Sequence, residues 1–339
     1  MKSNDFRPIL TLMQSRTRRQ LLVTASLATL LSCARTPKAI MSKKLPWVIA
    51  HRGASGVLPE HTLAAYQLGA EQGANVIEPD LVMSGDAVLI VRHDHYLGAS
   101  TDVSLKFPER QRAGAGIATP DWFSEDFSAL EFAQLRARQP WPQRSALHND
   151  RHTVPTFAQV LDLRAALELS LARPLYIYPE LKLPSYFASL GLDPVPAFIA
   201  AYRACSTPVQ ARILIQCFEP QALQRLRAEL GPHAWLTQLL PASDGKQEIA
   251  LELTEIARYA QAIGPNKQAL IDANGVSTGL LEQAHALSLA VHSWTFRDDV
   301  LPSHYTSITD ELGAYFALGV DGVFCDFPET AVRVRSSMR

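Results

Sequence analysis

Residues 47–82 read WVIAHRGASGVLPEHTLAAYQLGAEQGANVIEPDLV and contain one full structural unit. The apolar run 47–50 predicts a strand. Residues 60–73 then place apolar side chains at helical spacing and end at Gly73, which predicts a helix with a glycine C-cap. The β-branched run 76–82 predicts a second strand. A strand, a helix and a strand in this order are typical of a parallel sheet.

The same alternation continues towards the C-terminus. Further strands are expected at 87–91, 175–181, 213–218, 235–239, 262–264, 290–295 and 322–325. Helical patterns intervene at 156–171, 194–205, 220–230, 248–259, 278–286 and 308–318. Repeated units of this kind favour an α/β fold whose sheet is doubly wound or closed into a barrel. Nine strands are one too many for an eight-stranded barrel, so one is expected to be wrong or to belong to an added hairpin.

Residues 98–153 interrupt the alternation. They lack a clear strand period and carry aromatic and proline clusters at 107–108, 120–122 and 139–142. We interpret them as a small, partly helical insertion into a scaffold of residues 46–332. An α/β barrel uses about 250 residues, so the 339-residue chain has room for one such domain.

The composition is that of a globular protein. Hydrophobic residues make up 47% of the chain, which is too apolar for disorder. The 32 basic and 33 acidic side chains give a formal net charge of −1. Nucleic-acid binders usually present a basic face, so no nucleic-acid partner is expected.

Residues 1–32 differ in composition from the rest of the chain. Basic residues outnumber acidic ones five to one there, and an apolar run at 21–32 follows, which is typical of an export signal. The Arg-Arg pair at 18–19 resembles a twin-arginine signal. Residues 30–33 resemble a bacterial lipobox, in which Cys33 is acylated. We therefore expect an exported protein, periplasmic or anchored to a membrane through lipid on Cys33. The alternatives are a buried N-terminal helix and an ordinary cleaved signal.

The chain has four cysteines, Cys33, Cys205, Cys217 and Cys325, and no Cys-x-x-Cys pair. Neither thiol redox chemistry nor a zinc ribbon is therefore indicated. Cys217 and Cys325 lie in apolar, strand-like runs, which favours a role as small buried hydrophobic residues.

Charged and histidine side chains gather at the carboxyl ends of predicted strands. The clusters are His51-Arg52-Gly53, Glu78-Pro79-Asp80, His93-Asp94 and Glu180-Leu181-Lys182. In a barrel these strand ends share one face, where enzymes place their working residues. A spacing of two residues puts both side chains of a pair on one face of a strand. Each cluster alone could be a turn or an ion pair. However, two carboxylates in an apolar run need a cation or protons.

Together the clusters predict metal-assisted chemistry at phosphorus. The candidate residues are three carboxylates, two imidazoles and two cations: Glu78, Asp80, Glu180, His51, His93, Arg52 and Lys182. Carboxylates without a nearby cysteine favour Ca²⁺ or Mg²⁺ over zinc. The imidazoles can donate and accept protons near neutral pH. The two cations suit phosphate oxygens.

On these motifs the chain resembles the glycerophosphodiester phosphodiesterase family. Matching residues run in consistent order from 47 to 330 and include 53–56, 58–62, 178–182, 216–218, 263–265 and 321–328. The likeness is strongest to the exported bacterial branch that hydrolyses glycerophosphocholine. Family members more often read Pro-Glu-Asn-Thr where this chain has His61, a position not thought to be used in catalysis.

The resemblance implies a TIM (β/α)8 barrel with a small insertion. It implies that the three carboxylates bind a divalent cation, Ca²⁺ in preference to Mg²⁺, and that His51 and His93 are the general acid and base. Arg52 and Lys182 would hold the phosphate. The implied substrate is a small glycerophosphodiester, which is hydrolysed to an alcohol and sn-glycerol 3-phosphate, with membrane contact only through the N-terminal lipid.

Aromatic residues near predicted strand ends are candidates for the substrate cleft. They are Trp122, Phe123, Tyr186, Phe218, Trp294 and Phe327. Aromatic residues at strand ends often belong to the core, so we do not expect all six to line the cleft. We expect only Phe218 and Trp294 to contact substrate. Two alternative functions stay open. One is a phospholipase or sphingomyelinase of the same superfamily, and the other is a surface lipoprotein with a binding role.

Overall fold

The computed structural model describes residues 45–114, 117–241 and 253–338. The predicted export signal, its Arg-Arg pair and Cys33 lie outside the described residues. So does the first part of the helix predicted at 248–259. Within the described ranges, no helix combines the length and the apolar character needed to cross a membrane.

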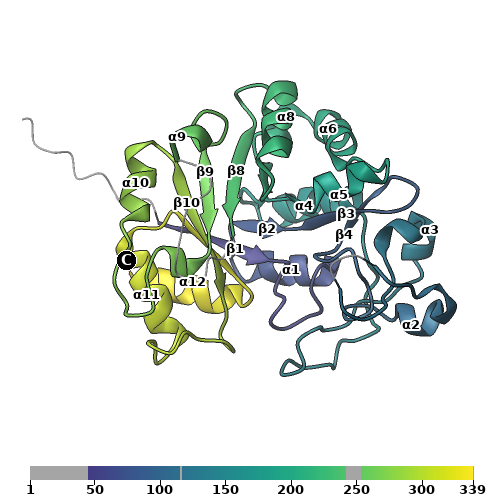
Figure 1. The fold of residues 1–339 in the computed structure, drawn as a ribbon. Helices are drawn as coiled ribbons and strands as arrows, with labels where there is room; N and C mark the ends of the chain where they lie inside the picture. Colours follow the sequence, from purple (N-terminus) through teal and green to yellow (C-terminus); the bar gives the residue numbers. More distant parts are fainter. Residues whose placement is uncertain (1–44, 115–116, 242–252, 339) are drawn as a thin grey trace, which may run out of the picture. The chain divides into compact units, whose positions relative to one another are not determined.

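Parallel strands form the centre of the fold, with helices outside them (Figure 1). β1 (Trp47–His51) pairs on one side with β2 (Val76–Glu78) and on the other with β11 (Gly322–Cys325). The other barrel strands also pair in parallel, and those after residue 181 are β7 (Leu214–Cys217), β8 (Trp235–Leu240), β9 (Ala262–Pro265) and β10 (Ala290–Phe296). Because β11 returns to β1, the sheet is closed, and the predicted barrel is confirmed.

Two barrel strands are interrupted by a proline. Pro79 separates β2 from β3 (Asp80–Met83), and Pro179 separates β5 (Tyr176–Ile177) from β6 (Glu180–Leu181). Proline donates no hydrogen bond, but its carbonyl still accepts one. The carbonyl of Pro79 accepts from the Glu180 amide at 2.9 Å, so the strands remain paired across the break. With each interrupted strand taken as one, the described residues form eight parallel barrel strands and β4.

The surplus strand is the one predicted at 87–91. β4 (Leu89–Val91) pairs with β3 in antiparallel register, Met83 opposite Leu89, and forms a hairpin outside the barrel. The connection from β3 is too short for a parallel crossover, which takes about a dozen residues. The expectation that one strand belongs to an added hairpin is therefore confirmed.

The predicted helices are present with small changes at their ends. They are α1 (Leu63–Glu71), α4 (Phe157–Ser170), α6 (Pro194–Ala204), α8 (Pro220–Leu230), α9 (Leu253–Ile256), α10 (Leu280–Ala286) and α11 (Ile308–Leu318). Three further helices were not predicted: α5 (Pro184–Ser189), α7 (Thr207–Gln210) and α12 (Pro328–Ser336). Helix α1 begins where the Thr62 hydroxyl accepts from the Ala65 amide, an N-cap that satisfies one free donor.

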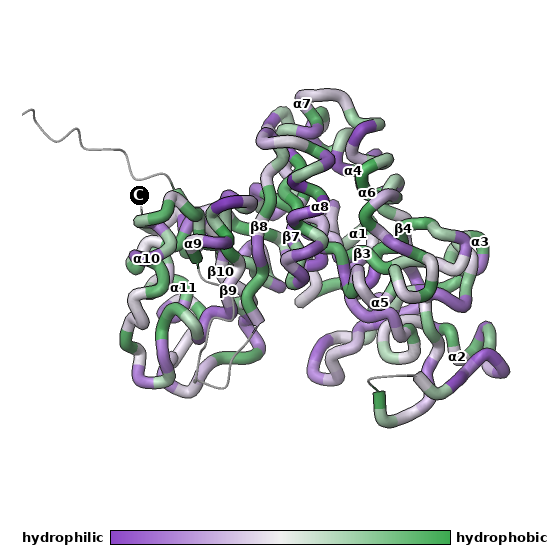
Figure 2. Tube along the Cα trace, turned by 45° about the horizontal axis from the view of Figure 1, so that its top comes forward, coloured by the Kyte–Doolittle hydropathy of each residue, from purple (hydrophilic) through white to green (hydrophobic). Residues whose placement is uncertain are grey.

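The segment 98–153 contains only short helices within its described residues. They are α2 (Val103–Lys106), α3 (Ala129–Phe132) and two 3₁₀ turns. Figure 1 shows α2 and α3 beyond β4, on the side away from β9 and β10. Figure 2 shows a hydrophilic stretch beside α2, where the sequence reads Glu109–Arg112.

Apolar side chains fill the inside of the barrel as well as the layer beneath the helices. Ile49, Val76, Tyr178, Leu214 and Phe324 form a separate buried cluster from five strands. The barrel is therefore a packed core, and polar side chains are accommodated at its carboxyl end.

Candidate active site

A cavity of about 170 Å³ opens at the carboxyl ends of the barrel strands. Six of the seven charged and histidine residues predicted for the site line it: His51, Arg52, Glu78, His93, Glu180 and Lys182. Asp80, the seventh, is buried against its neighbours. Phe218 and Trp294 also line the cavity, with ring centroids 6.0 Å apart. Trp122, Phe123, Tyr186 and Phe327 do not, while Phe324, which was not predicted, does.

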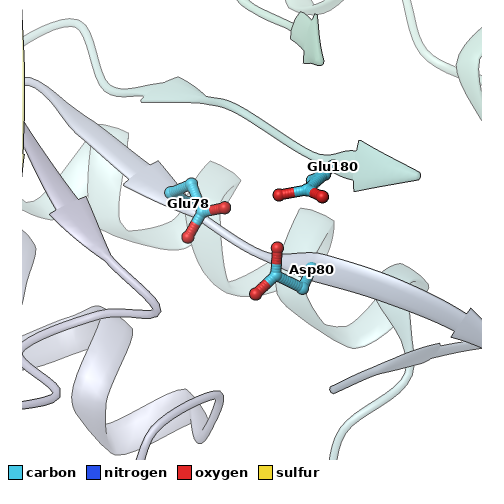
Figure 3. Close-up of side chains that lie close together, drawn as sticks. All are labelled: Glu78, Asp80 and Glu180. Atoms are coloured by element: carbon cyan, nitrogen blue, oxygen red, sulfur yellow. The ribbon is translucent and has the colours of Figure 1, made fainter. Parts of the chain in front are cut away.

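Three carboxylates lie together at this cavity, and two of them line it. Glu78, Asp80 and Glu180 each offer an oxygen within 4.8 Å of the others, and Figure 3 shows them pointing towards one another from adjacent strands. Burial and the neighbouring carboxylates raise the pKa of Glu78 well above its usual range. Burial also raises the pKa of Glu180 to about 8, although Lys182 opposes the shift. An all-oxygen, negatively charged cluster of this kind fits a hard divalent cation.

Each carboxylate is oriented by a partner. Glu78 accepts from the Arg52 amide and from the Gln216 side chain, both at 2.9 Å. The Nε2 atom of His61 lies 2.9 Å from Asp80, and the Nδ1 atom of His61 lies 2.7 Å from the Tyr66 hydroxyl. Asp80 is buried, which favours its neutral form, but Lys182 and His61 keep its pKa well below the usual range. His61 therefore positions a carboxylate.

Gln216 has one orientation that its surroundings permit. Its Nε2 atom faces two acceptors, the Glu78 carboxylate at 2.9 Å and the Tyr178 carbonyl at 3.2 Å. A flipped amide would set oxygen against both. The Gln216 Oε1 atom is buried, has no hydrogen-bond partner among the described residues, and belongs to a side chain that lines the cavity. It is thus available to accept from a hydroxyl or to contact a cation.

His51 is paired with a carboxylate from the last strand end. Its Nδ1 atom lies 2.7 Å from Asp326 Oδ1. Burial, then Arg52, lower the pKa of His51 to about 4. Asp326 is also buried, but His51 and nearby arginines keep its pKa far below the usual range. Because the ionised carboxylate can only accept, Nδ1 carries the proton and Nε2 is left with a free lone pair.

His93 has the same kind of partner in a more open position. Its Nδ1 atom lies 2.8 Å from Asp94 Oδ1. The His93 side chain is 32% exposed, against 12% for His51. Burial, followed by Arg52 and Lys182, lowers the pKa of His93. Both imidazoles of the site are therefore fixed by a carboxylate at Nδ1.

The Arg52 side chain is held in place by two carboxylates. Its Nη1 atom donates to Glu60 at 2.9 Å and its Nε atom lies 3.4 Å from Asp80. Burial of Glu60 favours its neutral form, but Arg52 lowers its pKa to about 2. The backbone turns sharply here, with φ of 58° at Arg52 and 86° at Gly53. A Cβ on Gly53 would lie 2.5 Å from the Ala65 carbonyl carbon, so only glycine fits.

Sequence reasoning missed several members of the site. Gln216 lies within the strand predicted at 213–218, and Asp326 follows the strand predicted at 322–325. Both lie in matched motifs, but no role was assigned to them. Glu60 and His61 were placed at the start of the helix predicted at 60–73, and no role in the site was assigned to them. Arg144, which contacts Asp326, lies in the segment without a clear strand period, and no pattern in the sequence marks it.

The glycerophosphoryl diester phosphodiesterase family model matches residues 51–330 of the chain. The chain belongs to this family. Family membership makes it an enzyme of the phosphoric diester hydrolase class. The glycerophosphodiester phosphodiesterase of Haemophilus influenzae is 30% identical over 321 residues, covering 84% of this chain and 88% of that protein. The one from Treponema pallidum is 27% identical, covering 84% and 90%.

Solved structures of family members share the fold. A crystal structure of a glycerophosphoryl diester phosphodiesterase from Silicibacter pomeroyi aligns with a TM-score of 0.66 at 24% identity, covering 87% of this chain and 94% of that one. A phosphodiesterase from Oleispira antarctica, in complex with sn-glycerol-3-phosphate, aligns with a TM-score of 0.61 at 19% identity, covering 86% and 97%. At these identities the likeness supports the barrel and not the details of the site.

Proposed function

We propose that the chain hydrolyses glycerophosphodiesters to an alcohol and sn-glycerol 3-phosphate, with glycerophosphocholine as a substrate. One observation carries the proposal. Two carboxylate-bound imidazoles, two cations and two of three clustered carboxylates line the same cavity. The cavity, at about 170 Å³, has room for a small polar molecule. The Oleispira antarctica relative, solved with sn-glycerol-3-phosphate, is consistent with this product.

Glu78, Asp80 and Glu180 would hold a divalent cation, for which we propose Ca²⁺. When bound, the cation would lower the pKa of a glycerol hydroxyl and offset charge on the phosphate. Ca²⁺ tolerates irregular sets of carboxylate oxygens better than Mg²⁺, which demands near-octahedral geometry. The cluster supports this choice because its carboxylates are not arranged as a regular ring. Asp80 pairs with Glu180 on the neighbouring strand, and Glu78 lies two residues before Asp80.

The two histidines would move the protons. With its proton fixed on Nδ1, His51 presents a free Nε2 lone pair to the cavity, so we assign it to remove the proton of the attacking 2-hydroxyl. His93 is the more exposed of the two and would enter this step protonated, with Nδ1 bonded to Asp94; it would give its Nε2 proton to the departing alcohol and become neutral. In the second half, water opens the cyclic phosphate and the two imidazoles exchange roles.

Arg52 and Lys182 would bind the phosphate oxygens. Both line the cavity, and each is held by a carboxylate, Arg52 by Glu60 and Lys182 by Glu180 at 2.8 Å. Phe218 and Trp294 form an edge-to-face pair at the same mouth and would contact the alcohol. The Trp294 indole donates to the Gly264 carbonyl at 2.8 Å, which fixes the ring.

The decisive test measures release of sn-glycerol 3-phosphate from glycerophosphocholine. Purified protein is stripped with EDTA and each cation is then added back. We expect activity with Ca²⁺ and a loss of at least about 100-fold for His51→Ala and His93→Ala. Absence of product with any cation would contradict the proposal. Faster turnover of micellar phospholipid than of the soluble diester would favour the phospholipase alternative.

We also propose that the chain is exported and anchored through Cys33. The support is the sequence pattern of residues 1–33 alone. Expression with labelled palmitate should give a labelled mature protein, and Cys33→Ala should remove the label. An unlabelled protein that is cleaved elsewhere would refute the anchor without affecting the proposed reaction.

A further inference from the structure

We infer that Arg144 is a positioning residue for His51, so that the segment 98–153 is part of the catalytic apparatus. The inference rests on the proposed function, in which His51 exchanges a proton with the substrate. Nothing in the sequence pattern marks Arg144, and it does not line the cavity. Its contacts argue for the role.

The Arg144 guanidinium joins four parts of the fold. Its side chain is only 2% exposed. Nη2 donates to Asp326 Oδ2 at 2.6 Å and to Asp299 Oδ1 at 3.1 Å, and Nε donates to Asp299 Oδ2 at 2.7 Å. Nη1 donates to the Ser55 carbonyl at 3.2 Å. The inserted segment is thus bonded to the loops that follow β1 and β10 and to the end of β11.

The two oxygens of Asp326 have separate tasks. Oδ1 faces His51 at 2.7 Å, while Oδ2 accepts from Arg144 at 2.6 Å and from Arg297 at 2.9 Å. Rotation of the carboxylate would break contacts at both oxygens at once. The guanidinium groups therefore fix the carboxylate plane, and that plane fixes the His51 ring. An error of about 1 Å in such a ring can cost 100-fold in rate.

Arg297 alone cannot replace Arg144. Arg297 is 22% exposed and contacts Asp326 through Nε, at 2.9 Å. Arg144 is nearly inaccessible and makes four bonds that leave it one position. Both guanidinium groups also lie over the ring of Trp141, at 4.9 and 5.1 Å from its centroid. Since Trp141 belongs to the inserted segment, that segment orders both arginines.

The first test is kinetic and has a matched control in the same segment. Arg138 forms a two-point ion pair with Asp150, at 2.6 and 3.0 Å, on the surface. For Arg144→Met we expect kcat on glycerophosphocholine to fall about 10- to 100-fold while KM changes less than about threefold. Arg144→Lys should lose less. Arg138→Met should keep kcat within about twofold of the wild type.

Chemical rescue separates positioning from folding. Arg144→Ala leaves space for a free guanidinium ion, so added guanidinium at millimolar concentration should raise kcat several-fold. The same addition should not rescue His51→Ala. A loss of kcat in Arg144→Ala without rescue, or an equal loss in Arg138→Met, would show a merely structural role and overturn the inference.

A spectroscopic readout is independent of turnover. The Nδ1 proton of His51, bonded to Asp326, should give a low-field proton resonance that is assigned by its loss in Asp326→Asn. In Arg144→Met we expect this resonance to shift and broaden, and in Arg138→Met to stay unchanged. If the wild type hydrolyses no diester, the proposed function fails while this measurement still decides the role of Arg144. An unchanged resonance in Arg144→Met refutes it.

Discussion

Replacing Asp326 with asparagine should trap His51 in the wrong tautomer. Asp326 Oδ2 accepts from two guanidinium groups, those of Arg144 and Arg297. The asparagine will therefore keep its oxygen there and turn its NH₂ group towards His51. The Nδ1 atom of His51 must then accept, so its proton moves to Nε2. The atom that removes the substrate proton is no longer a base.

The size of the effect follows from the cost of turning the asparagine round. The opposite orientation would restore the His51 tautomer but would give up two hydrogen bonds to charged groups, each worth about 1.5–3 kcal/mol. The trapped form is thus favoured by about 3–6 kcal/mol, or about 10²–10⁴ in population. We expect kcat to fall by this factor, which is also the range for loss of a general base.

The assay is steady-state hydrolysis of glycerophosphocholine with excess Ca²⁺, read as sn-glycerol 3-phosphate released. Asp150→Asn is a matched control, because Asp150 also accepts from an arginine but at the surface. It should retain kcat within about twofold. If Asp326→Asn folds, binds substrate and keeps kcat within about tenfold of the wild type, His51 does not depend on the tautomer that Asp326 fixes.

Three further predictions concern the cation, acid stability and the alcohol side of the cavity. Ca²⁺ should raise the melting temperature of EDTA-treated wild type, and Asp80→Asn, which still accepts from His61, should lose most of that shift in a thermal scan. Glu60 has its pKa lowered from 4.5 to about 2, so its contribution to stability is present above pH 4.5 and is lost as the pH falls towards 2. We therefore compare the unfolding free energy of wild type with that of Glu60→Gln by urea titration. The difference between the two proteins should be about 2 kcal/mol smaller at pH 3 than at pH 7. An equal difference at both pH values would show that Arg52 does not stabilise the charged form of Glu60. Phe218→Ala and Trp294→Ala should raise KM for glycerophosphocholine about 3- to 10-fold with less effect on kcat, and an unchanged KM would place the alcohol elsewhere.

Local periodicity was enough to predict the barrel strands but not where two of them break. The runs 76–82 and 175–181 each read as one strand, and the structure divides both at a proline. The residues that flank the breaks include Glu78, Asp80 and Glu180. The prolines are visible in the sequence. The sequence does not show that the neighbouring strand still donates hydrogen bonds to their carbonyls, because that pairing depends on the register between distant segments.

The candidate site residues could be proposed from the sequence because each lies at or near a strand end, where topology alone brings side chains to one face. Their partners were not, because a partner is set by packing in three dimensions. Asp326 was visible in a motif, yet only the register of β11 on β1 shows which histidine it meets. Arg144 lies outside the short helices of segment 98–153, in a stretch without helix or strand, and such a stretch gives no register to reason from.

Closure of the barrel and assembly of the His51–Asp326 pair are the same structural event. β1 pairs with β11 so that Ala50 lies opposite Cys325. The residues that follow these two in the sequence are His51 and Asp326. The pair joins residues 275 positions apart. A chain that folded β1 to β10 without β11 would hold the carboxylate cluster of β2, β3 and β6 but would leave Nδ1 of His51 without its acceptor. The motif at 321–328 is therefore needed for the base as well as for the last strand. Its strand residues close the barrel, and the residue directly after them fixes the tautomer on which the proposed proton transfer depends.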